Sequence, residues 1–175
     1  MKKNILITGM PGTGKTTLIR KILADIAALN PAGFYTEEIR EAGVRRGFAL
    51  ISTDGVRSIL SHENIRSPFR VGKYGVDLNS FESFIDRIPF RDPDRRLLVI
   101  DEIGRMECFS RKFTQLTSEL LSSDRRVLAT VAMKGTGLIA DVKARPDVEL
   151  IEITRDNRND LLRHLLQVFS RNVTS

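Results

Sequence analysis

The sequence predicts an α/β protein with a mostly parallel central sheet, helices on both faces of that sheet, and an antiparallel β insertion after the first helix. Three observations lead to this prediction. Short apolar runs alternate with longer segments of helical periodicity over most of the 175 residues. A glycine-rich loop joins the first apolar run to the first helical segment. Two strand-like runs separated by a short turn interrupt the alternation and predict the insertion.

The first half of the chain is expected to hold two helices and the antiparallel strands. The first strand covers about residues 3–8, and the first helix runs from Lys15 to Leu29, where Asn30 and Pro31 end it. Strands at 33–40 and 44–52 form the antiparallel pair, and a short apolar run at 56–60 follows the turn at 53–55. After a polar loop at 62–68 and a glycine-interrupted segment at 69–76, a helix begins at Asp77 or Asn79 and ends near Ile88.

The second half returns to regular alternation. The continuous apolar run at 97–100 predicts a central parallel strand. An amphipathic helix is expected at 109–121, a strand at 126–132, at most a short helix within 135–145, a strand at 148–154, and a last helix from Asp156 or Asn157 to about Ser170. In such sheets, ligands bind at the carboxyl ends of the strands, which is where the glycine-rich loop is expected.

The glycine-rich loop fits G-x-x-x-x-G-K-[ST], the phosphate-binding loop, and it has the strand before it and the helix after it that this motif requires. Its glycines allow a close approach of the backbone to phosphates. Lys15 would reach the β- and γ-phosphates, and the hydroxyl of Thr16 would hold Mg²⁺. The predicted nucleotide-binding residues of this segment are Gly9, Met10, Pro11, Gly12, Thr13, Gly14, Lys15, Thr16 and Thr17.

A second motif follows the apolar run at 97–100. Asp101 emerges at the carboxyl end of that strand and can hold Mg²⁺, as the Walker-B aspartate does. Glu102 comes next, and a carboxylate beside the metal-binding aspartate can orient and polarise a water for attack on the γ-phosphate. Because a kinase must exclude such a water, the pair favours hydrolysis. Lys15 and Glu102 are therefore predicted to be catalytic.

Composition limits the remaining possibilities. The chain has a formal net charge of +6 but no dense basic cluster with interleaved aromatic residues, so nucleic acid is a conceivable partner that the sequence does not favour. Cys108 is the single cysteine, which excludes an intrachain disulfide and favours the reducing cytoplasm. No apolar run is long enough for a signal peptide or a membrane span. The length suits one domain over residues 1–175, and a monomer is favoured.

The segment from Asp101 to Ser110, Asp-Glu-Ile-Gly-Arg-Met-Glu-Cys-Phe-Ser, resembles the signature of the small P-loop nucleoside-triphosphatases. This family is known from thermophiles and includes the human cancer-related nucleoside-triphosphatase. Segments 33–38, 71–76 and 154–158 also resemble the family. The resemblance implies the three-layer P-loop fold and Mg²⁺-dependent hydrolysis of several nucleoside triphosphates (ATP, GTP, CTP, UTP and TTP). It also suggests Asn157 and Arg158 as contacts to the base, with a helix cap and a surface arginine as the alternative interpretation.

Several residues and functions stay open at this point. Arg105, which stands where the family signature leads us to expect lysine, is the best candidate for an arginine finger, and a solvated loop arginine is the alternative. Glu37 could support the attacking water or the metal, or be an edge-strand charge that discourages aggregation. Glu107 could assist Glu102 or cap the helix that begins near Phe109. Thr130 could sense the γ-phosphate or bond to the backbone. A nucleotide or nucleoside kinase and a nucleotide-gated RNA-binding switch remain the alternative functions.

Overall fold

The computed structural model describes residues 2–170, whose helices alternate with strands much as the sequence predicts. The strands are β1 (Asn4–Thr8), β2 (Ala32–Glu41), β3 (Val44–Ser52), β4 (Arg57–His62), β5 (Arg70–Val71), β6 (Tyr74–Val76), β7 (Leu97–Ile103), β8 (Arg126–Val131) and β9 (Val148–Glu152). The helices are α1 (Lys15–Asp25), α2 (Leu78–Asp86), α3 (Arg111–Ser122), α4 (Leu138–Ala144) and α5 (Arg158–Ser170), with short 3₁₀ turns η1 (Ala27–Leu29) and η2 (Glu107–Phe109).

Within this described part of the chain, nine strands form one sheet in the order β5-β6-β4-β3-β2-β7-β8-β1-β9. The five strands from β2 to β9 are parallel to their neighbours. From β2 outward, β3, β4, β6 and β5 continue the same sheet in antiparallel pairs. The predicted insertion is therefore an extension of the central sheet, which is mixed: β2 belongs to both halves.

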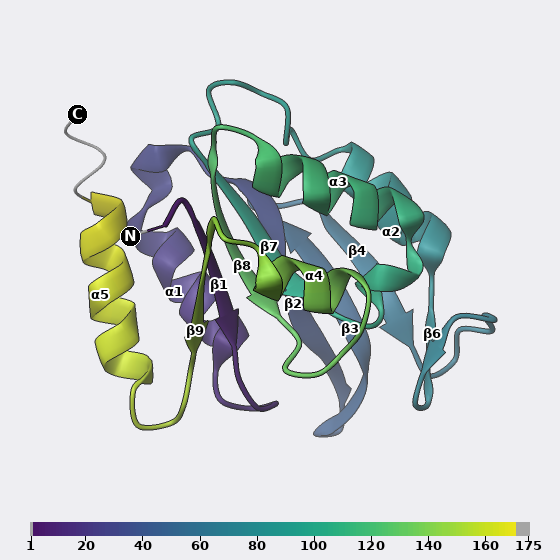
Figure 1. Cartoon of the computed structure of the whole chain (residues 1–175). Helices are drawn as coiled ribbons and strands as arrows, with labels where there is room; N and C mark the ends of the chain where they lie inside the picture. Colours follow the sequence, from purple (N-terminus) through teal and green to yellow (C-terminus); the bar gives the residue numbers. More distant parts are fainter. Residues whose placement is uncertain (1, 171–175) are drawn as a thin grey trace.

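Helices cover both faces of the parallel half (Figure 1). The side chains of α1 and α5 form one core with alternate residues of β1 and β7, such as Ile5 and Val99. The side chains of α2, α3 and α4 form the other core with the intervening strand residues, such as Leu6 and Ile100. Since both faces of β1, β7 and β8 are covered, each of these strands contains a continuous apolar run. The predicted α/β class with helices on two faces is confirmed.

One buried aromatic side chain ties the insertion to the rest of the sheet. Phe34 of β2 is fully buried, and its ring meets those of Phe81 and Phe84 on α2 and Phe113 on α3 edge-on, at centroid distances of 6.2, 5.8 and 6.4 Å. Such aromatic contacts add about 0.5–1.5 kcal/mol each to the free energy of burial. They fix β2 beside β7, where the candidate site lies.

Helix starts follow the capping signals in the sequence. Asp77 accepts a hydrogen bond from the N–H of Ser80 at 2.9 Å and begins α2. Ser110 accepts one from the N–H of Phe113 at 3.0 Å, so α3 begins at Arg111, two residues after the predicted start. The predicted first helix is too long: α1 ends at Asp25, and the rest is the 3₁₀ turn η1.

Candidate functional site

The loop between β1 and α1 has the backbone of a phosphate cradle. Gly9 and Gly14 have φ angles of 150° and 99°, which residues with a side chain rarely adopt. A Cβ on Gly9 would lie 2.5 Å from the carbonyl oxygen of Ile153, so the loop packs closely against the segment that follows β9. Gly14 then leads directly into α1. Backbone N–H groups of the loop and of the first helical turn can therefore face an anion.

Lys15 is the first residue of α1, and its ammonium folds back over the loop. Nζ donates hydrogen bonds to the carbonyl oxygens of Gly9 at 2.9 Å and Met10 at 3.3 Å. An ammonium has three N–H donors, so capacity for a phosphate oxygen remains. The hydroxyl of Thr13 donates to the carbonyl oxygen of Met10 at 2.8 Å and stiffens the turn. Met10, Pro11, Gly12 and Thr17 are exposed on the rim of the loop or the helix.

Asp101 is fully buried, and three threonines from three different elements surround its carboxylate. Thr16 of α1 donates its hydroxyl to Oδ2 at 2.8 Å, and Thr130 of β8 donates its hydroxyl to Oδ1 at 2.6 Å. The N–H of Thr36 on β2 reaches Oδ2 at 3.3 Å. Burial raises the pKa of Asp101, and the bonds from these threonines oppose that rise. The two predicted metal ligands, Thr16 and Asp101, thus lie side by side.

This oxygen-rich pair fits Mg²⁺. A hard cation of this kind takes one or two protein oxygens and completes its shell with water and substrate phosphates. No group of three or more His, Cys, Asp and Glu side chains arranged to hold a metal occurs within residues 2–170. Thr16 and Asp101 are thus the residues that could hold such a cation together with a bound polyphosphate.

Glu102 and Glu107 place two carboxylates around one glycine. A Cβ on Gly104 would lie 2.8 Å from Oε2 of Glu107 and 3.5 Å from Oε1 of Glu102. Burial, and after it the charge of Asp101, raises the pKa of Glu102, while Lys15 and Lys143 lower it. Burial, and after it the charge of Glu102, raises the pKa of Glu107 to about 8. Glu107 is thus predominantly protonated at neutral pH beside the predicted water-orienting acid.

Lys143 and Thr36 complete this environment, and the sequence analysis did not identify them. Lys143 lies on α4, donates to the carbonyl oxygen of Met133 at 2.8 Å and acts electrostatically on Glu102. No local pattern marks it, because its position depends on how α4 packs. The sequence could have identified Thr36, because it is a polar residue two positions after a buried phenylalanine, near the carboxyl end of the segment that pairs with β7.

The other predicted site residues lie around this centre. Asn157 accepts a hydrogen bond from the N–H of Thr154 at 2.8 Å and donates one to the carbonyl oxygen of Glu152 at 2.8 Å, so its side chain holds the turn before α5. Arg158 is exposed at the start of α5. This turn adjoins the phosphate loop, because the N–H of Ile153 donates to the carbonyl oxygen of Thr8 at 2.8 Å.

Glu37 and Arg105 do not contact the acids at the end of β7. Glu37 pairs with Arg57 at 3.1 Å and with Arg20 at 3.6 Å. Arg105 is exposed and lines a cavity of about 560 Å³ between the loop after β7, the strand β5 and the start of α4. We call this the second cavity.

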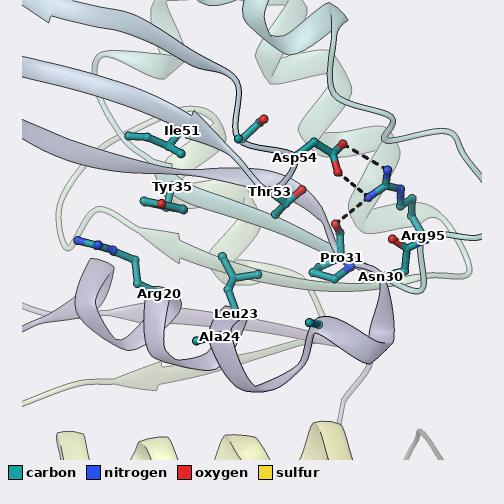
Figure 2. A pocket seen from close by; sticks show the side chains of 13 residues that line it. Arg20, Leu23, Ala24, Asn30, Pro31, Tyr35, Ile51, Thr53, Asp54 and Arg95 are labelled. Carbon is teal, nitrogen blue, oxygen red and sulfur yellow. Dashed lines mark hydrogen bonds and ion pairs between the residues drawn. The ribbon is translucent and has the colours of Figure 1, made fainter.

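A first cavity, of about 510 Å³, lies between α1 and the strands β2 and β3. Figure 2 shows its two ends. At one end, Arg95 donates to both carboxylate oxygens of Asp54, at 3.1 and 3.2 Å, and to the carbonyl oxygen of Pro31. At the other end, the guanidinium of Arg20 lies 5.4 Å from the ring centroid of Tyr35. The charged groups of this cavity therefore already have partners.

Comparison with known proteins gives the site its context. A family model described as NTPase matches residues 4–166. The chain belongs to this NTPase family. A relative named nucleoside-triphosphatase THEP1 from Thermotoga sp. (strain RQ2) is 42% identical over 169 residues, covering 96% of each chain. The human cancer-related nucleoside-triphosphatase is 38% identical over 180 residues, covering 93% of this chain and 94% of the human protein.

Solved structures of the NTPase family agree with the fold. The crystal structure of THEP1 from Aquifex aeolicus superimposes with a TM-score of 0.82 at 35% identity and covers 95% of this chain and 98% of that one. The solution structure of the human cancer-related protein gives 0.80 at 37% identity, with coverage of 95% and 96%. The family, fold and enzyme class predicted from the sequence are confirmed. Across residues 2–170, the structure contains no helix that is long and apolar enough to cross a membrane.

Proposed function

We propose that this member of the NTPase family hydrolyses nucleoside 5′-triphosphates to the diphosphate and phosphate with Mg²⁺, acting as one domain over residues 1–175 in the cytoplasm. The observation that carries the proposal is the placement of Glu102 directly after the buried Asp101, which bonds to Thr16 beside the phosphate loop. One carboxylate thus serves the metal, and the next is available for water.

The phosphate loop supplies the binding part of the reaction. Its N–H groups and the ammonium of Lys15 hold the β- and γ-phosphates, while Thr16 and Asp101 hold the cation. When bound, Mg²⁺ offsets the negative charge of the phosphate oxygens. Binding through phosphates is independent of the base, which supports activity on ATP, GTP, CTP, UTP and TTP. We assign the base side to the turn that carries Asn157 and Arg158, because Ile153 of that turn lies against Gly9.

Glu102 supplies the hydrolytic part. Its carboxylate orients a water for in-line attack on the γ-phosphorus and accepts a proton from it, while the bond from that phosphorus to the β–γ bridging oxygen breaks. The protonated Glu107 beside it adds no second charge to repel the phosphates. Arg105, which follows these acids along the chain, is assigned the positive charge that stabilises the transferring phosphoryl group.

The test is phosphate release from the five triphosphates, with Mg²⁺ and with a chelator, for wild type and Glu102→Gln. We expect release from several triphosphates that the chelator abolishes and that the variant reduces by roughly 10²–10⁴-fold, with nucleotide binding retained. Glu119→Gln removes an exposed acid on α3 and is the matched control. Unchanged turnover in Glu102→Gln would contradict the assignment of the water-orienting acid. Triphosphate consumption that depends on an added acceptor would favour a kinase.

A further inference from the structure

The second cavity differs from the first in its electrostatics. Three cations line it, Arg70, Arg105 and Lys134, and no carboxylate is among its lining residues. Within residues 2–170, Arg105 and Lys134 have no hydrogen bond or ion pair. Arg70 bonds only to the backbone carbonyl oxygens of Ile65 and Lys73, at 3.3 and 2.7 Å. The cavity therefore concentrates positive charge that nothing in its wall neutralises, which attracts an anion.

The cations of the first cavity and some of those on the antiparallel half of the sheet are paired with carboxylates. In the first cavity, Arg95 pairs with Asp54 at 3.1 Å and Arg20 pairs with Glu37 at 3.6 Å. On the antiparallel half of the sheet, Arg45 pairs with Glu38 at 3.1 Å. Within residues 2–170, exposed arginines elsewhere, such as Arg66 and Arg111, also lack an ion pair, so the second cavity is distinguished by three cations that share one wall without a carboxylate. Their gathering around one concave surface points to a ligand that carries the missing negative charge.

The uncharged residues that line the second cavity indicate which chemical groups the ligand carries besides its negative charge. Val71, Phe109 and Leu138 give the cavity an apolar side, and the ring of Phe109 is held by Phe69 at a centroid distance of 5.4 Å. Hydroxyls of Thr114 and Thr136 add hydrogen-bonding groups. A volume of about 560 Å³ lies within the usual range for small-molecule sites. An inorganic anion alone would leave the apolar side in contact with water.

We propose that the second cavity binds an organic phosphate, a phosphoryl group carried on a ring-bearing small molecule, while the phosphate loop holds its own nucleotide. Arg70 and Lys134 take the phosphoryl group, and Val71, Phe109 and Leu138 take the ring-bearing part, while Arg105, which lines the same cavity, keeps the role proposed for it in hydrolysis. Two short segments of the chain connect the second cavity to the hydrolytic site. Only two residues separate Arg105 from Glu102, and Leu138 begins the helix that carries Lys143. The inference goes beyond the proposed function and does not depend on hydrolysis.

Calorimetric titration of the full chain with three probes tests the proposal: AMP, ribose 5-phosphate and inorganic phosphate. Each titration is run with a saturating non-hydrolysable triphosphate and Mg²⁺, which occupy the phosphate loop, and is repeated without the triphosphate. We expect one of the two organic phosphates to bind at least tenfold more tightly than inorganic phosphate. Tighter binding of AMP identifies a nucleotide as the carrier, whereas equal or tighter binding of ribose 5-phosphate identifies a sugar phosphate.

Variants locate the binding. Lys134→Glu reverses an exposed charge of the cavity, and Thr136→Glu adds a negative charge to the same loop; each is expected to weaken binding by about tenfold or more, because like charges then face the ligand. Lys21→Glu, on the exposed side of α1 and outside both cavities, makes the same charge change and should leave the affinity unchanged. The proposal is overturned if no organic phosphate binds, if the saturating triphosphate prevents binding, or if all three variants behave alike.

Discussion

The hydroxyl of Thr130 donates a hydrogen bond of 2.6 Å to Oδ1 of Asp101, while Thr16 donates to Oδ2 of the same carboxylate. The Asp101 side chain is therefore held from the sheet on one side and from α1 on the other. Thr130 lies on β8, which separates the strand of the phosphate loop from the strand of the acid. It acts on the carboxylate that we assign to Mg²⁺.

Thr130→Val removes this bond and keeps the shape of the side chain. We expect the Mg²⁺ concentration for half-maximal hydrolysis to rise by about tenfold, because a hydrogen bond to a charged group contributes ~1.5–3 kcal/mol. Thr130→Ser keeps the hydroxyl and should stay near wild type. Activity as a function of Mg²⁺ at saturating nucleotide measures the effect, and equal Mg²⁺ dependence in the valine and serine variants would refute it.

Glu107 should make the stability of the protein depend on pH. Burial, followed by the charge of Glu102, raises its pKa from 4.5 to about 8 in the folded protein. The folded state therefore binds the proton of Glu107 more tightly than the unfolded state does. The stabilisation that results is fully present below pH 4.5 and is lost as pH rises to about 8. Within that window, the free energy of unfolding falls by up to about 1.4 kcal/mol per pH unit.

Glu107→Gln keeps an uncharged side chain at every pH. We expect its free energy of unfolding, measured in urea from about pH 5 to 8, to fall less steeply than that of wild type and to exceed it at the upper end. The exposed control Glu119→Gln should follow the wild-type slope. Parallel curves for wild type and Glu107→Gln would show that Glu107 is not the source of the pH dependence.

Gly33 of β2 lies opposite Val99 of β7 in the parallel pair. A Cβ on this residue would lie 1.9 Å from the carbonyl oxygen of Val99, so Gly33→Ala must push the two strands apart. We expect a loss of more than ~3 kcal/mol in the free energy of unfolding. Gly43→Ala is the matched control: nothing lies within 4 Å of its Cβ, and only its φ of 78° opposes a side chain, which costs about 1–2 kcal/mol. Equal losses in urea denaturation would contradict this account.

Gly9→Ala should act on nucleotide binding more than on folding. Its Cβ would lie 2.5 Å from the carbonyl oxygen of Ile153, and relief of that contact moves the phosphate loop away from the turn after β9. We expect nucleotide affinity to fall by about tenfold or more, since the loop N–H groups lose their alignment. Fluorescent nucleotide titration measures the loss, and an unchanged dissociation constant would mean that the loop tolerates the shift.

Local signals explain which parts of the fold were predictable. The apolar runs of β1, β7 and β8 and the caps at Asp77 and Ser110 act over a few residues, and the predicted elements lie close to the observed ones. The predicted end of the first helix was wrong because the buried Ile26 and Leu29 continue the apolar pattern through a 3₁₀ turn. Periodicity cannot distinguish these two helix types over one turn.

Some residues of the candidate site could likewise be predicted from local motifs, and others could not. The phosphate loop, Thr16 and Asp101 follow from motifs, and the structure brings them together. Thr130 was open between sensing the γ-phosphate and bonding to the backbone, and its hydroxyl instead donates to the carboxylate of Asp101. Lys143 could not have been found, because its approach to Glu102 depends on the packing of the short helix α4. Nor does the sequence show that Glu107 is buried beside Glu102, since this depends on the turn η2 that follows β7.

The position of β8 between β1 and β7 has a consequence for how this protein can vary. Strands lie about 4.8 Å apart, so the phosphate loop and the acids stand two strand spacings from each other, roughly 10 Å at the backbone. A single interposed strand thus works as a spacer of fixed width. A longer loop at the antiparallel edge, between β5 and β6, leaves that width unaltered, because neither strand lies between the phosphate loop and the acids.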